Sequence, residues 1–354
     1  MREMYLKETK QILKGIKPTE YTEVDSFQKE ESIDLIAEGN ALTYFHYTNN
    51  LDVSNLFNAM RMYAHYNIQY DGFMPQVFVG KEVTLLNYYG VLYTVDYTND
   101  KLVSLAYENV MNTKERFTFI DGGYNWYLVS SKYVVECNDG TITTYHIGIN
   151  GGVWFKNRFI FGGFTAPKRG DVPYLALDVK SMFQNLTTNS IWWSTVGGGF
   201  TSTQFQENIT NYDYLQRFDL GFASIKGTFK KAVLFGSKFV IGTTEAVYLC
   251  DIIVGEIITL SAQEILNSGI QADCIEVVNN TLYIVADDGS LMVYEGQRFK
   301  DLDFKYIFSE LSGLYMLKND KKQELYICNG TVGYVVKGEE VYPLSKSISG
   351  LITI

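Results

Sequence analysis

The stretch Cys274–Leu302, CIEVVNNTLYIVADDGSLMVYEGQRFKDL, indicates how this chain folds. Apolar side chains recur at every second position in three short runs, which are Ile275 and Val277, Leu282 and Ile284, and Leu291 and Val293. This alternation is the period of a half-buried β-strand. The runs are separated by Asn279-Asn280 and by Asp287–Ser290, and the Asp-Gly pair within the second break favours a tight hairpin turn. The stretch therefore predicts a meander of three antiparallel strands, the building block of propeller blades and barrels.

Five other parts of the chain repeat this pattern of short apolar runs and turn residues. They are Val83–Glu108, Arg116–Ile147, Gly152–Thr195, Phe229–Ser261 and Gly313–Ser345. Repeats of roughly 30 to 50 residues are typical of propellers and other repeat architectures. The sequence predicts an all-β fold, a β-propeller of about six blades built from antiparallel meanders, over residues 77–354.

Residues 1–76 have a different character and are expected to form a short N-terminal arm and helix. Residues 1–40 are polar, and residues 52–66 place Leu56, Phe57 and Met60 on one face at helical spacing. This apolar face predicts either packing on the β body or docking on a neighbouring subunit, and we treat the three residues as interface candidates.

Two further segments depart from the repeats. Residues 196–228 contain Gly197-Gly198-Gly199 and a polar run, which predict a long exposed loop. The tail Ser345–Ile354 ends in an apolar, strand-like run. This strand is expected to close the ring by completing the first or the last blade, because an open sheet edge invites aggregation.

Composition fits an ordered β protein of acidic charge. The 354 residues are 46% hydrophobic and 20% charged, with 27 Tyr and 22 Phe, residue types that favour strands. A formal net charge of −10 makes the chain a poor electrostatic match for nucleic acid, since phosphate binding relies on Lys and Arg.

Targeting and redox signals are few. The charged N-terminus lacks the apolar core of a signal peptide, and no stretch is long enough to predict a membrane span, so we expect synthesis in a cytoplasm and no membrane partner. Four cysteines, Cys137, Cys250, Cys274 and Cys328, lie far apart in apolar runs and are expected to be buried free thiols.

Catalytic and cofactor motifs are missing from the sequence. The histidines His46, His65 and His146 are isolated, and there is no Walker A, GxGxxG or GxSxG motif. We expect no catalytic, cofactor-binding or metal-binding residues. Asn138–Thr141 and Asp287–Ser290 are loosely similar to the Asp-box turns of propeller sialidases, but turn geometry accounts for them without chemistry.

One segment is similar to a known family. Residues Gly151–Ser194 combine an aromatic strand, Lys156-Asn157-Arg158, an apolar run ending in Gly162-Gly163, and Ile191–Ser194. This order resembles the tail nozzle, tail hub or stabilisation propellers of short-tailed bacteriophages, and Lys231–Asp251 resembles the next blade. The similarity covers about residues 150–300.

The resemblance implies a structural virion protein of a phage tail, made in the host cytoplasm. Such a protein would assemble as a hexameric ring, contact portal or adaptor proteins and tail fibre or tip proteins, and form part of the DNA exit conduit without binding DNA specifically. Its motif residues would have packing roles. Arg158 is expected to pair with an acid on a neighbouring strand, and Trp192 and Trp193 to point to opposite faces, one into the core and one to an inter-blade or inter-subunit surface.

Two other classes remain open from sequence. A carbohydrate-binding or glycoside-hydrolase-like propeller predicts an axial pocket with converging carboxylates and activity as a monomer. A protein-interaction propeller is the third, although the Gly-His and Trp-Asp signatures of WD40 repeats are missing.

Overall fold

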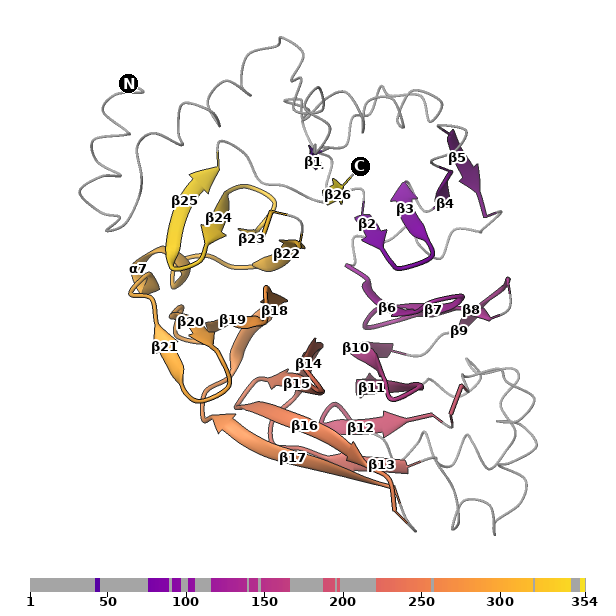
Figure 1. The fold of residues 1–354 in the computed structure, drawn as a ribbon, viewed down its shortest axis with the longest axis horizontal. Helices are drawn as coiled ribbons and strands as arrows, with labels where there is room; N and C mark the ends of the chain where they lie inside the picture. Colours follow the sequence, from indigo (N-terminus) through magenta and orange to yellow (C-terminus); the bar gives the residue numbers. More distant parts are fainter. Residues whose placement is uncertain are drawn as a thin grey trace.

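The fold of this chain is almost entirely antiparallel β-sheet (Figure 1). The computed structural model describes residues 42–44, 76–88, 91–96, 101–105, 116–138, 140–145, 148–165, 187–194, 196–197, 221–255, 258–320, 322–344 and 351–353. Within these ranges the α-helical structure is one short turn, α7 (Lys305–Phe308). The expected all-β class is confirmed.

Among the described strands, β2 to β25 form six consecutive meanders of four. The first contains β2 (Gln76–Val79), β3 (Thr84–Tyr88), β4 (Val91–Asp96) and β5 (Lys101–Ser104). The second contains β6 (Thr118–Gly122), β7 (Asn125–Val129), β8 (Val134–Asn138) and β9 (Thr141–Tyr145). The third contains β10 (Gly148–Phe155), β11 (Arg158–Thr165), β12 (Ser190–Trp193) and β13 (Gly221–Ser224).

The second half of the chain continues the series. The fourth meander contains β14 (Phe229–Phe235), β15 (Lys238–Thr243), β16 (Val247–Ile253) and β17 (Thr259–Leu266). The fifth contains β18 (Ile270–Val278), β19 (Thr281–Ala286), β20 (Leu291–Tyr294) and β21 (Phe299–Asp301), and the sixth contains β22 (Tyr315–Asn319), β23 (Glu324–Cys328), β24 (Gly333–Lys337) and β25 (Glu340–Leu344). A parallel bridge between Asp273 and Tyr315 joins these last two meanders into one eight-stranded sheet.

The six repeats expected from the sequence thus correspond to six meanders, each with one strand more than the three assigned to the opening stretch. One boundary was wrong. The expected loop 196–228 includes β13, whose residues pair in register with β12, and the buried Ile225 follows it. Ala223 and Ile225 lie two positions apart and both pack in the core cluster of the third and fourth meanders, which is the alternation of a half-buried strand.

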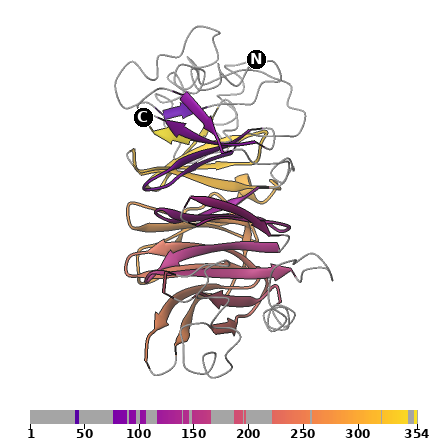
Figure 2. The same cartoon turned by 90° about the vertical axis from the view of Figure 1, so that its right-hand side faces the viewer.

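The meanders follow one another around a common centre, with the first strand of each innermost (Figures 1 and 2). Neighbouring inner strands are in contact from β6 through β10, β14 and β18 to β22. The hydrophobic core lies between adjacent sheets rather than in one central mass. For example, Val153 and Trp193 pack with Phe229 and Phe239 in a cluster that spans the third and fourth meanders.

Tight turns of the kind expected from the sequence connect the strands. Asn279 and Asn280 adopt φ values of 48° and 60°, and Lys156 and Asn157 adopt the same pair of values. Two successive left-handed residues are the geometry of the two-residue hairpin turn that follows strand twist. Gly289, at φ 88°, completes the Asp287–Ser290 turn, where the Asp288 carboxylate accepts a hydrogen bond from the Ser290 N–H.

The C-terminal tail forms a strand, but it pairs differently from the expectation. Strand β26 (Leu351–Thr353) pairs with β1 (Leu42–Tyr44) in a separate two-stranded sheet and does not join the first or the sixth meander. It contacts both β2 and β22, so it lies where the first and last meanders meet (Figure 1). The expected arm at 1–40 and helix at 52–66 lie outside the described residues.

Candidate functional site

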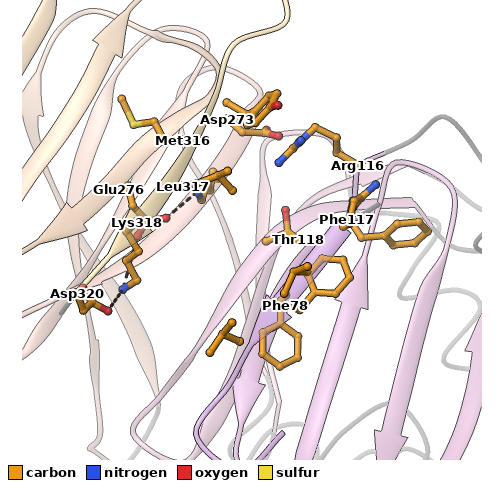
Figure 3. Close-up of a pocket in the computed structure, with 16 residues that line it drawn as sticks. Phe78, Arg116, Phe117, Thr118, Asp273, Glu276, Met316, Leu317, Lys318 and Asp320 are labelled. Atoms are coloured by element: carbon orange, nitrogen blue, oxygen red, sulfur yellow. Dashed lines mark hydrogen bonds and ion pairs between the residues drawn. The ribbon is translucent and has the colours of Figure 1, made fainter. Parts of the chain in front are cut away.

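A cavity of about 490 Å³ lies among the inner strands at the centre of the molecule (Figure 3). Its walls come from β2, from Arg116–Phe119 at the start of β6, and from β14, β18 and β22. We call this space the axial cavity. Because it is built from strands far apart in sequence, its chemistry depends on how the meanders are placed around the centre.

The walls combine charged and apolar side chains. The cations are Arg116, Lys231 and Lys318, and the anions are Asp273, Glu276 and Asp320. Apolar side chains such as Val77, Phe119 and Leu317 complete the lining. Among the described residues the formal charges of the lining therefore balance.

Glu276 is the centre of an ion network on one wall. Its Oε2 lies 3.0 Å from Lys231 Nζ, with both side chains 14% exposed, and its Oε1 lies 3.9 Å from Lys318 Nζ. Lys318 also lies 3.4 Å from Asp320 (Figure 3). Burial raises the pKa of the Glu276 carboxyl, but the opposing charges of Lys231 and Lys318 outweigh burial, and its pKa is lowered from the ordinary value.

Arg116 and Asp273 occupy another part of the cavity, and their side chains point toward one another (Figure 3). The guanidinium carbon of Arg116 lies 3.6 Å from the centre of the Tyr315 ring, a cation–π contact. Within the described part of the chain, neither Arg116 nor Asp273 forms a hydrogen bond or an ion pair through its side chain. Their polar groups are therefore available at the cavity wall.

Directional contacts tie each meander to the next near the cavity. Gln76 Oε1 accepts a 2.8 Å hydrogen bond from the Phe117 N–H, and Ile149 N–H donates to the Ser130 carbonyl at 2.8 Å. Asn150 Nδ2 donates to the Phe229 carbonyl at 2.8 Å. The Lys231–Glu276 and Glu276–Lys318 pairs continue the series, so five successive meander interfaces are cross-linked.

Arg158, expected to fix blade geometry, is buried in β11 at 3% exposure. Its Nη1 donates a 3.0 Å hydrogen bond to the Ser194 carbonyl, while Ser194 Oγ accepts one from the Phe159 N–H. These bonds clamp the end of β12 to the start of β11. The expected acidic partner of Arg158 stays a prediction.

Trp192 and Trp193 are both buried within the chain and face opposite sides of β12. The Trp192 ring stacks on Phe161, which in turn meets the Tyr127 ring of the second meander edge-on. Trp193 belongs to the cluster shared with the fourth meander. Each indole is thus at an inter-sheet surface, and with exposures of 0% and 2% neither is placed at a subunit surface. The other three candidates, Leu56, Phe57 and Met60, lie outside the described residues.

Sequence reasoning did not single out the axial residues. The signal was present in charged side chains within otherwise apolar inner strands, such as Glu276 in IQADCIEVV and Lys231 in FKKAVLF. A lone charge in a strand does not reveal its partner, because the partner here lies 45 residues away.

Comparisons with known proteins leave the family open. No family model and no curated protein matches the chain. Among solved structures, the computationally designed Ika8 protein is 14% identical with a TM-score of 0.39, covering 73% of this chain and 69% of that one. The extracellular domain of the putative hybrid two component system BT4673 from B. thetaiotaomicron is 9% identical with a TM-score of 0.48. That match covers 87% of this chain, which spans 37% of the other chain's length.

Among the described residues, no helix has the length and apolar character needed to cross a membrane. In the same residues, no group of three or more His, Cys, Asp or Glu side chains has metal-binding geometry.

Proposed function

We propose that the six meanders are the blades of a closed β-propeller. The support is their order around one centre, the contacts between successive inner strands, and the position of β26 against both β2 and β22. In this arrangement the β1–β26 pair closes the ring, and the Arg116–Tyr315 contact joins the second blade to the sixth across the axial cavity.

We further propose that this propeller is a structural virion protein of a bacteriophage tail, assembling as a hexameric ring in the DNA exit conduit. The sequence resemblance suggests this role. The observation that supports it best is the cross-linking of successive meanders near the axis, as a structural component that has to hold its shape requires. Portal or adaptor proteins and fibre or tip proteins would be its neighbours.

The conduit in this proposal lies between subunits and not through the axis of one chain. A cavity of about 490 Å³ is the size of a small-molecule pocket. Duplex DNA is a much larger object, since its major groove alone is about 12 Å wide. The acidic net charge of −10 suits a lumen that repels phosphate.

An exposed apolar rim is our candidate for contact with a neighbouring subunit. Val196, Ile253 and Val254 are 51%, 53% and 64% exposed. Their segments both lie beside the Lys156-Asn157 turn, because Gly197 N–H donates to the Asn157 carbonyl and Lys156 Nζ donates to the Ile252 carbonyl. Apolar groups gathered in this way on a surface are typical of interaction sites.

Charged side chains introduced on this rim test whether the protein assembles into a ring through it. The double change Ile253→Asp and Val254→Asp is expected to convert the assembled protein to monomers while the circular dichroism spectrum stays unchanged. Leu234→Asp, at a residue 49% exposed elsewhere, is the matched control and should leave assembly intact. A ring that still forms in the double variant would show that the rim is not part of the subunit interface. A ring that still forms after deletion of residues 1–40 would show the same for the arm.

Glycoside hydrolysis is the alternative, and the axial cavity does contain the converging carboxylates that it requires. A glycosidase needs one carboxyl with a raised pKa to act as the acid. Glu276 has a lowered pKa and is held by two lysines, and Asp320 lies beside Lys318. These pairings favour a structural role for that wall over catalysis.

A further inference from the structure

We propose that the axial cavity binds a neutral mono- or disaccharide, with Arg116 and Asp273 as the groups that hydrogen-bond its hydroxyls. This inference concerns binding and not hydrolysis, and it does not depend on ring assembly.

The size of the cavity fits such a ligand. Small-molecule sites in proteins measure about 300 to 1,000 Å³, and the axial cavity measures about 490 Å³. One or two sugar rings can therefore occupy it.

The charge of the cavity selects against ionic ligands. The three cations and three anions of the lining balance, and two of the cations are engaged by Glu276 and Asp320. A phosphate or a nucleotide would meet Asp273, Glu276 and Asp320 without an excess of positive charge to offset them. A neutral ligand with many hydroxyls meets no such penalty.

Arg116 and Asp273 together offer what a sugar needs. Adjacent hydroxyls each donate and accept, so they pair with a guanidinium, which only donates, and a carboxylate, which only accepts. The Tyr315 ring, 3.6 Å from the guanidinium carbon, holds Arg116 in place before a ligand arrives. Since neither group forms a hydrogen bond or an ion pair with another described side chain, a ligand can bind both without breaking one.

The opposite walls provide an apolar surface for the C–H face of the ring. Val77 on β2, Phe119 on β6 and Leu317 on β22 line the cavity and are each partly exposed. Figure 3 shows the two sides of the cavity, with Phe78, Phe117 and Thr118 on the β2–β6 side and Glu276 and Leu317 on the other.

The test is saturation-transfer NMR and calorimetry on the full chain with glucose, galactose, N-acetylglucosamine, maltose and lactose at millimolar concentrations. Glycine and inorganic phosphate serve as zwitterionic and anionic controls. At least one saccharide should bind, and Arg116→Gln and the isosteric Asp273→Asn should each weaken it by about tenfold or more. Lys156→Gln, in an exposed ion pair with Asp251, is the matched control and should leave affinity unchanged.

Circular dichroism and the melting temperature confirm that each variant is folded, and Asp273→Asn keeps the side-chain shape if Arg116→Gln is unstable. Lack of binding by every saccharide, binding of glycine or phosphate alone, or saccharide binding that survives both substitutions would overturn the proposal. None of these outcomes bears on whether the protein forms a ring.

Discussion

Lys231 on β14 and Glu276 on β18 form a 3.0 Å ion pair that joins the fourth and fifth meanders beside the axial cavity. Both side chains are 14% exposed, so water screens the pair poorly. The backbone N–H of Val277 also donates to Glu276 Oε1 at 3.2 Å. The carboxylate is thus satisfied from two other inner strands and from its own.

Removing the lysine should be costly. Lys231→Met leaves Glu276 nearly buried with only Lys318, at 3.9 Å, to offset its charge. We expect a loss of about 2 to 3 kcal/mol in the free energy of unfolding, measured by urea denaturation. The double variant Lys231→Met with Glu276→Leu should recover part of this loss. A double variant less stable than the single one would contradict the conclusion that Lys231 is the main partner of a nearly buried Glu276.

The same pair predicts a dependence of stability on acid. Because the folded pKa of Glu276 is lowered from 4.5, its contribution is present above pH 4.5 and is lost as pH falls through the folded pKa. The stability difference between the wild type and Glu276→Gln should therefore shrink below about pH 4.5. Urea denaturation at a series of pH values measures it, and a difference that stays constant with pH would argue against the ion pair.

Gly162 on β11 is predicted to tolerate no side chain. A Cβ there would lie 2.2 Å from the ring of Phe229, which is 1% exposed. Gly162→Ala should cost about 1 to 3 kcal/mol through overpacking, and Phe229→Leu in the same chain should relieve part of it.

Its cross-strand partner Gly151 is the matched control, because a Cβ there meets the same ring at 3.4 Å, an ordinary contact. Gly151→Ala should be tolerated within about 0.5 kcal/mol. Equal losses in the two variants would show that sheet propensity, and not the Phe229 contact, is responsible.

The four cysteines should be unreactive in the folded protein. Cys137, Cys250, Cys274 and Cys328 are buried free thiols, as the sequence predicts, and burial raises the pKa of Cys250 to about 12. A thiol reagent at pH 8 should label none of them until denaturant is added, and then all four. Rapid labelling of the native protein would mean that the inter-sheet packing opens.

Local sequence patterns were sufficient to predict the repeated meanders, because a two-residue alternation and its turn residues both act within a few positions. The turn at Asn279-Asn280 is an example. The pairing of β26 with β1 could not be predicted, since three-residue strands carry too little pattern to choose a partner. The axial cavity was missed for a related reason: Arg116, Asp273 and Tyr315 come together only when distant meanders surround one centre.

The ring is the central claim of the proposed function, and the native mass of the purified protein tests it most directly. Native mass spectrometry, supported by sedimentation velocity, should give a species near six times the 40.3 kDa mass of the chain. A monomer of 40.3 kDa at all concentrations, with no association with phage particles, would contradict the account.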